Sequence, residues 1–171
     1  DTIAALRALI AVLEQAPADA RANVLAALLP QLDAIPDAMV TAAQLRLLEQ
    51  RGVTIGAHGE SHDPLTRVPD AGAELRGARE KLARHLQAAG PNLMSFPHGR
   101  FNGAIVGDAL AAGYELLFTS VPAVNDTRAA LQPLIARVGV ETETLSDESG
   151  RYRPDLLALN MFNRPRRSLA A

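Results

Sequence analysis

The sequence predicts an α/β fold in which helix predominates over strand. Two observations lead to this prediction. Short apolar runs that suit strands alternate with helical patterns of about ten or more residues, and Gly, Pro or a capping residue marks the transitions. Strands separated by helices of this length pair in parallel through right-handed crossovers. The chain has 171 residues, 48% of them hydrophobic, which is sufficient for one domain with a hydrophobic core.

The composition excludes several classes of protein and partner. The formal net charge is -2 and the dense basic cluster is confined to residues 164–167, so we predict no nucleic-acid partner. The chain has no cysteine, so any metal site has to use His and carboxylate ligands. No apolar run approaches the roughly 18 residues of a membrane span, and we predict none.

Two further features concern the origin of the chain. Asp1 stands first in place of Met, which leads us to expect that residues upstream are missing. Ala and Arg are abundant and Lys81 is the single lysine, a bias that we associate with bacterial genomes. The compartment stays open between the cytoplasm and the cell envelope.

The first forty residues are predicted to form a helical hairpin. Apolar residues recur at helical spacing from Ile3 to Leu13, and Pro17 ends this pattern. A second pattern runs from Val24 to Leu32 and is kinked or ended by Pro30, which lacks an amide donor. We expect these helices to serve packing. An alternative is a helical assembly protein whose functional surface is residues 1–50.

Residues 41–140 are predicted to carry the alternating helices and strands. Helices are expected over 41–51, over a long segment that Asp70 caps and that Gly90-Pro91 ends, and over 104–112. Strands are expected over residues 53–57, 93–96, 114–119 and 134–140. Residues 142–153 are expected to be a loop, and residues 156–162 a closing helix.

Two histidines, His58 and His62, follow the first predicted strand at its carboxyl end. If a helix begins near His58, the interval of four places both imidazoles on one face, within reach of one ion. Imidazole suits Zn, Co, Ni or Fe, and a catalytic zinc site needs a third protein ligand. Catalytic groups of parallel α/β folds gather at the carboxyl ends of strands, which favours a metal site over structural capping by these histidines.

The same stretch disfavours two classes of hydrolase. The interval matches the H-E-x-x-H motif of zinc proteases, but Gly59 follows the first histidine where that motif has Glu. Ser61, His62 and Asp63 have the residue types of a catalytic triad, yet adjacent residues do not bring their side chains into the required line. Glu60 is expected to be exposed, with an outer-shell role towards a ligand histidine as the alternative.

Three segments of the chain resemble the polysaccharide deacetylases, also called NodB-homology proteins or family 4 carbohydrate esterases. Residues 52–65, which include His58-Gly59-Glu60-Ser61-His62, resemble the second motif of that family. Residues 95–100, Ser-Phe-Pro-His-Gly-Arg, resemble the third motif, and residues 112–120 resemble the glycine-aromatic turn and strand that follow it. The resemblance covers about residues 41–140.

The resemblance implies a metal-dependent hydrolase that removes acetyl groups from an N-acetylated polysaccharide. It implies an incomplete distorted (β/α) barrel and a divalent metal, most often Zn with Co or Ni as alternatives, bound by His58 and His62. It further implies that the backbone amide of His98 contacts the oxyanion, a catalytic role, and that Phe96, Pro97 and Gly99 bind substrate. In the family an aspartate of the first motif completes the metal site and its neighbouring aspartate acts as the base.

The chain departs from the family pattern at several positions. No Asp-Asp pair occurs, and Asp33 and Asp37 lack a preceding strand, so neither is assigned to the first motif. Ser95 stands where many members have Arg, and His98 stands where an aromatic residue is common. The late Leu-x-x-His segment is absent, and Asn160 is only a distant substitute for its catalytic acid.

We therefore expect one deacetylase-like domain over residues 1–171 that is truncated at its N-terminus. Residues 1–40 are the hairpin insertion, residues 41–140 the motif-bearing core, and residues 141–171 a loop and C-terminal helix. The chain as it stands is expected to be inactive, and exposed sheet edges predict a homo-oligomer or domain swap. The alternative is a non-catalytic module that binds glycan or protein.

Other residues receive simple structural interpretations. His85 is expected on the solvated face of the long helix, where it has no role in the site. Phe96 and Tyr114 are expected to pack in the core, with the Tyr114 hydroxyl reaching a partner.

Overall fold

The computed structural model describes residues 2–31, 39–87, 90–126, 132–164 and 166–167. The chain divides into two compact units, Asp1–Thr41 and Ala42–Ala171. Asp33 and Asp37 lie outside the described residues.

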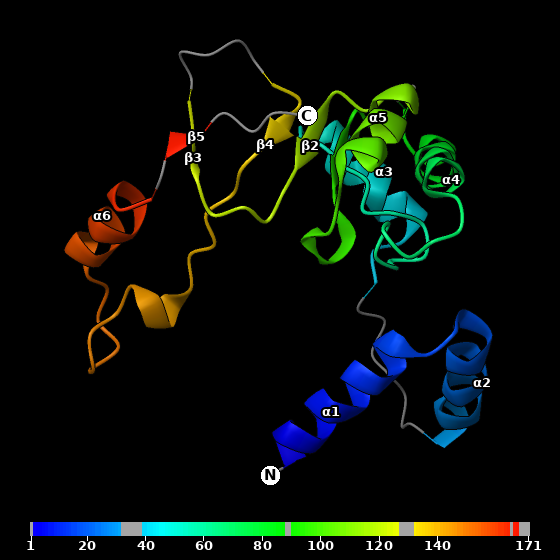
Figure 1. The fold of residues 1–171 in the computed structure, drawn as a ribbon, viewed down its shortest axis with the longest axis horizontal. Coiled ribbons are helices and arrows are strands. Elements are labelled where there is room, and N and C mark those ends of the chain that lie inside the picture. The colour runs from blue at the N-terminus through cyan, green and yellow to red at the C-terminus, as the bar shows by residue number, and fades with distance from the viewer. Residues whose placement is uncertain (1, 32–38, 88–89, 127–131, 165, 168–171) are drawn as a thin grey trace. The chain divides into compact units, whose positions relative to one another are not determined.

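The first unit contains the two predicted helices, drawn in blue in Figure 1. They are α1, Thr2–Gln15, and α2, Ala18–Leu28, and α2 passes into the 3-10 helix η1, Leu29–Gln31. The α-helical pattern ends there because Pro30 has no amide to donate. None of the described side chains of these helices is buried, and most of their large apolar residues are exposed: Ile3, Leu6, Leu9, Ile10, Val12, Val24, Leu25, Leu28 and Leu29.

The second unit is organised around a parallel sheet, as the sequence predicts (Figure 1). The strands are β1, Leu93–Ser95, β2, Leu116–Phe118, and β4, Leu134–Ile135, in the order β1-β2-β4. Met94 lies opposite Leu117, and Phe118 lies opposite Ile135. A second parallel pair, β3, Val124–Asn125, with β5, Arg166–Arg167, was not predicted.

The strand predicted over residues 53–57 is reduced to a single bridge. Ala57 pairs in parallel with Met94, its amide donates to the Leu93 carbonyl at 2.8 Å, and its carbonyl accepts from the Ser95 amide at 3.0 Å. Among the described residues, β1 is the only strand that Ala57 bridges, so no second ladder lengthens this segment. The described sheet has three strands, and the distorted barrel stays a prediction.

The described helices of the second unit follow one another along the chain in the predicted order. They are α3, Ala42–Gln50, α4, Ala71–Ala83, α5, Gly103–Ala111, and α6, Pro154–Phe162, with short 3-10 helices η2, Pro97–Gly99, and η3, Thr142–Thr144. The predicted cap of α4 is confirmed, because the Asp70 side chain accepts from the Ala73 amide at 2.8 Å. No helix of the described residues is long and apolar enough to span a membrane.

The helix α4 is shorter than predicted. It ends at Ala83, and His85 follows it instead of lying in its middle. Side chains of α3 bind the backbone of this following segment: Arg46 Nε donates to the His85 carbonyl at 3.1 Å, and the Gln87 amide donates to Glu49 at 2.7 Å. The His85 carbonyl and the Gln87 amide thus find hydrogen-bond partners on α3 instead of within a longer helix, which accounts for the end of α4 at Ala83.

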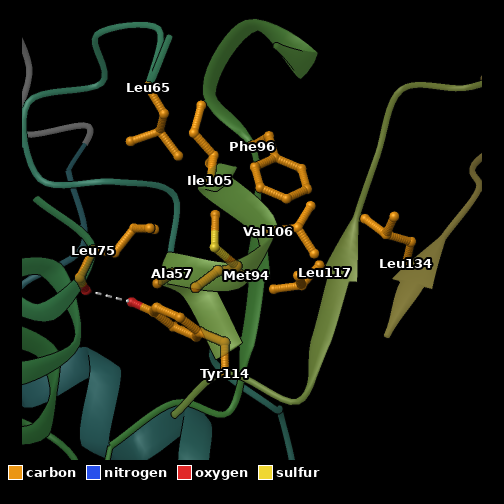
Figure 2. Close-up of a cluster of buried hydrophobic side chains, with 11 residues drawn as sticks. Ala57, Leu65, Leu75, Met94, Phe96, Ile105, Val106, Tyr114, Leu117 and Leu134 are labelled. Atoms are coloured by element: carbon orange, nitrogen blue, oxygen red, sulfur yellow. Dashed lines mark hydrogen bonds between the residues drawn. The ribbon is translucent and has the colours of Figure 1, made fainter. Parts of the chain in front are cut away.

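The hydrophobic core lies between the sheet and the helices α4 and α5 (Figure 2). It includes Leu75, Met94, Phe96, Val106, Tyr114 and Leu117, each at most 2% exposed. The Tyr114 hydroxyl donates to the Leu75 carbonyl at 3.0 Å, the dashed line in Figure 2. Burial raises the pKa of Tyr114 to about 12, against the opposing effect of Arg79. This core fixes the carboxyl end of β1, from which the candidate site is built.

Candidate functional site

Three histidines come together where the β1 region ends. His58 follows the Ala57 bridge, and His98 lies in η2, three residues after the last residue of β1. The ring centroids of His58 and His62 are 4.9 Å apart, and those of His62 and His98 are also 4.9 Å apart. The rings are tilted against each other by 59° and 52°. The structure therefore gathers both predicted metal ligands and His98 into one exposed cluster.

No helix begins at His58, so a helical face is not what pairs the histidines. Residues 58–63 form an irregular loop in which Gly59 has φ +76° and His62 has φ +64°. Among the described residues, His62 and His98 (φ +55°) are the only non-glycine residues with positive φ. A left-handed conformation costs a non-glycine residue roughly 1–2 kcal/mol, and such residues concentrate at functional sites.

The ring of His58 is oriented by the strand beside it. Its Nδ1 lies 2.7 Å from the Ser95 carbonyl oxygen, which can only accept, so Nδ1 carries the proton and donates. In the neutral ring this leaves Nε2 as the basic nitrogen. Histidines that bind metal use this arrangement, with one ring nitrogen donating to a carbonyl and the other facing the ion. The chemistry of His58 therefore suits a metal ligand.

His98 belongs to a tight turn that the core holds in place. Its Nε2 donates to the His62 carbonyl at 3.2 Å, which joins the turn to the loop of the other two histidines. The Gly99 amide donates to the Phe96 carbonyl at 3.0 Å, and the Arg100 amide donates to the Pro97 carbonyl at 3.2 Å. The backbone of this turn is thus fixed on both sides of His98.

The residues predicted to bind substrate differ in their exposure. Phe96 is 1% exposed and stacks on Phe101 with ring centroids 4.7 Å apart, and Pro97 is also buried. Gly99 is partly exposed, with φ +65°, and a Cβ there would lie 2.5 Å from Ser120 Oγ. Phe96 and Pro97 support the turn from the core, and their contact with a substrate stays a prediction.

Two polar residues at the cluster were not identified from the sequence. Glu74, on α4, accepts hydrogen bonds from the loop that joins His58 to His62. Arg137 joins the carboxyl ends of two strands, since Nη2 donates to Ser95 Oγ at 2.9 Å and Nε donates to the Thr119 carbonyl at 2.8 Å. A single charged residue within the apolar run 134–138 is the signal that could have indicated Arg137.

A complete set of metal ligands is not found in the part of the chain that the structure describes. There, no three His, Asp or Glu side chains are grouped so that they could hold a metal ion. Asn160, the distant substitute for the catalytic acid, lies on α6 and accepts from Arg164 Nη2 at 3.2 Å. It lines a cavity of about 560 Å³ together with Val121 and Thr144.

The chain is similar to known polysaccharide deacetylases. A family model described as polysaccharide deacetylase matches residues 6–117, which confirms the resemblance seen in the sequence. Among solved structures, a polysaccharide deacetylase from Bacillus cereus is 17% identical with a TM-score of 0.54, over 60% of this chain and 33% of that one. The deacetylase PplD of Streptococcus pyogenes, in complex with acetate, is 20% identical with a TM-score of 0.60, over 74% of this chain and 52% of that one.

A further solved structure, IcaB from Ammonifex degensii, is 19% identical with a TM-score of 0.53, over 62% of this chain and 50% of that one. At these identities the likeness shows a shared fold. The chain spans from 33% to 52% of the length of the three structures. Among curated protein sequences, none matches the chain.

Proposed function

Because the chain belongs to the polysaccharide deacetylase family, we propose that it supplies two metal ligands to a hydrolase that removes N-acetyl groups from a polysaccharide. The observation that carries this proposal is the pairing of His58 and His62, whose ring centroids lie 4.9 Å apart beside the end of β1. The reaction would cleave the amide C–N bond of an N-acetyl group with water and yield acetate and a free amine on the sugar.

His58 and His62 would hold the metal through their imidazole nitrogens, and Zn is the first choice, with Co or Ni as alternatives. When bound, such an ion supplies Lewis acidity that polarises the acetyl carbonyl and acidifies water. The hydrogen bond from His58 Nδ1 to the Ser95 carbonyl would keep that ring from rotating. A third ligand, which the family takes from an aspartate, has to come from residues other than those described.

The backbone amide of His98 is our candidate for the oxyanion contact. The amides of Gly99 and Arg100 are already used within the turn, by the carbonyls of Phe96 and Pro97. These hydrogen bonds fix the backbone on both sides of His98, whose ring centroid lies 4.9 Å from that of His62. A donor that is held in place before the reaction stabilises developing charge without a cost of reorganisation. Gly99, partly exposed beside it, would border the sugar.

We further propose that this chain alone has little or no activity. The base that the family takes from its first motif is not among the described residues, and general-base assistance typically contributes about 10²–10⁴-fold to the rate. His58, His62 and His98 would then bind metal and substrate without completing the hydrolysis.

A second candidate function is a non-catalytic module that binds glycan or protein on this scaffold. One observation favours it, namely that the described residues bring two predicted ligands together without a third. In such a module the exposed histidines and Gly99 would contact the sugar directly.

The test is to titrate the chain with an N-acetylglucosamine oligomer, with the glucosamine oligomer as the control. Binding is followed through the His98 and Gly99 amide resonances by NMR, and released acetate is measured in the same samples. The deacetylase proposal expects binding that needs Zn²⁺ and the acetyl group, with acetate release near background. Binding that persists in chelator and in His58→Ala would favour the module. No binding to either oligomer would contradict the deacetylase proposal and a glycan-binding module, leaving only a module that binds protein. Rapid acetate release would refute the proposed inactivity.

A further inference from the structure

The loop between the two histidines is bound by one carboxylate. We call residues 58–62 the histidine loop. One oxygen of Glu74, Oε1, accepts from the Glu60 amide at 2.8 Å, from the Ser61 amide at 2.6 Å and from the Ser61 hydroxyl at 2.9 Å. Hydrogen bonds to an ionised acceptor are roughly twice as strong as those between neutral groups. Glu74 therefore fixes the middle of the histidine loop.

The Ser61 hydroxyl extends this contact to the far side of His62. It donates to Glu74 and accepts from the Asp63 amide at 3.1 Å. His62 thus lies between Ser61, whose amide donates to Glu74, and Asp63, whose amide donates to the Ser61 hydroxyl that in turn donates to Glu74. Because His62 has φ +64°, its conformation needs such support from its surroundings.

A second contact between α4 and the histidine loop lies on the same side of the helix. Glu60 pairs with Lys81 at 2.5 Å, and its carboxylate lies so close to Gly77 that a Cβ there would overlap it. Residues at i, i+3 and i+7 lie along one face of a helix, so Glu74, Gly77 and Lys81 form a continuous stripe. We call these three residues the α4 stripe.

The helix that carries the stripe is itself anchored in the core. Asp70 caps its first turn. Leu75 and Ala78 are buried, and the Leu75 carbonyl accepts a hydrogen bond from the Tyr114 hydroxyl. Side chains on a fixed helix position a site more precisely than side chains on a loop do. Adjacent faces of α4 thus contact the core and the histidine loop.

We infer that Glu74 is a positioning residue for His58 and His62, acting through the Glu60 and Ser61 backbone, and that the α4 stripe as a whole seats the histidine loop. This inference rests on the proposed function, because it takes those two histidines to be metal ligands. Glu74 acts on the ligands through the loop and makes no contact with substrate in this role.

The test compares Glu74→Ala with Glu80→Ala, which removes an exposed carboxylate from the same helix, and with the conservative Glu74→Gln. Histidine ring resonances are recorded in the metal-free chain, and Co²⁺ affinity and its visible spectrum are measured for each variant. Thermal unfolding of each variant reports whether the fold is intact.

We expect Glu74→Ala to shift the ring resonances of His58 and His62 and to weaken Co²⁺ binding by about 10–100-fold, with an altered Co²⁺ spectrum. Glu74→Gln keeps an acceptor oxygen and should recover part of the affinity, while Glu80→Ala should match the parent chain. Unchanged ring resonances in a folded Glu74→Ala variant would overturn the inference.

The inference can still be tested if the parent chain binds no Co²⁺ or if Glu74→Ala does not fold. If the parent chain binds no Co²⁺, the proposed metal ligation fails, and the ring resonances alone decide whether Glu74 positions the loop. If Glu74→Ala does not fold, Ser61→Ala removes only the hydroxyl that joins Glu74 to Asp63. It should shift the His62 ring resonance, and a His62 resonance at its parent position would then overturn the inference.

Discussion

The two loops that form the histidine cluster differ in what holds them. The histidine loop, residues 58–62, is held by polar side chains of α4, chiefly Glu74. The second loop, residues 96–101, which we call the proline turn, is held by its own backbone hydrogen bonds and by buried Phe96 and Pro97. Yet each loop contains one histidine with positive φ, and the two rings lie 4.9 Å apart.

This difference separates the stability of the fold from the geometry of the site. A change in the proline turn removes core packing and should lower the free energy of unfolding. A change in the contacts of the histidine loop removes exposed hydrogen bonds and should move the ligands with a small loss of stability. The free energy of unfolding should therefore fall most for changes beneath the proline turn and least for changes in the contacts of the histidine loop.

Phe96→Ala should have the largest effect, because it leaves a cavity beneath the proline turn. Replacing a buried Phe by Ala lowers the free energy of unfolding by about 3–5 kcal/mol. Urea unfolding followed by circular dichroism measures it. The matched control is Phe162→Ala at a position that is 82% exposed, where the change should stay within about 0.5 kcal/mol. Equal losses at both positions would contradict the role given to Phe96.

Gly99→Ala should be the next largest. An alanine at φ +65° adopts a left-handed conformation, and its Cβ would lie 2.5 Å from Ser120 Oγ, so we expect a loss of about 2–4 kcal/mol. Gly107→Ala is the control, since nothing lies within 4 Å of its Cβ position in α5 and the change should stabilise the helix by about 0.5–1 kcal/mol. Urea unfolding should thus give opposite signs, and the same sign at both positions would refute this account.

Tyr114 joins the core under the proline turn to the helix under the histidine loop, and its burial raises its pKa to about 12. Because the pKa of Tyr114 is raised in the folded state, its stabilising contribution is fully present below pH 10. The free energy of unfolding then falls by about 2 kcal/mol as the pH rises towards 12. Urea unfolding between pH 9 and about 12 measures this slope. Tyr114→Phe should flatten it, and Tyr152→Phe, at a position 53% exposed, should not. A slope that Tyr114→Phe leaves intact would contradict the assignment.

Lys81→Met should have the smallest effect on stability. The ion pair between Lys81 and Glu60 joins side chains that are 57% and 35% exposed, so its contribution is about 0–1 kcal/mol and is screened by salt. Urea unfolding in low and high salt should differ little between variant and parent. A loss comparable to that of Gly99→Ala would show that the histidine loop contributes to the fold as strongly as the proline turn.

Much of the fold follows from local patterns in the sequence. The Asp70 cap, the end of α5 before Gly113 and the strands β1 and β2 depend on residues that are close in the chain, and all were predicted. The pairing of β3 with β5 joins residues about forty positions apart and has no local signal. The strand at residues 53–57 has the alternation of a strand, but its length depends on neighbouring ladders that the pattern does not reveal.

The candidate site was predictable in part for the same reason. His58 and His62 stand in a motif and were identified from it, although their pairing comes from two residues of positive φ and not from a helix. Glu74 and Arg137 act across gaps of 13 and 42 residues, on Ser61 and Ser95 respectively. An isolated Glu or Arg in the sequence does not indicate which loop it contacts, so both required the structure.

The Zn²⁺ affinity of single histidine variants shows directly whether His58 and His62 are metal ligands. Zn²⁺ binding is measured by competition with a chromophoric chelator for the parent chain, His58→Ala, His62→Ala and His85→Ala, the last being a matched change after the end of α4. We predict that His58→Ala and His62→Ala each abolish or greatly weaken binding and that His85→Ala leaves it unchanged. Equal affinity in all four proteins would contradict the assignment of His58 and His62 as metal ligands.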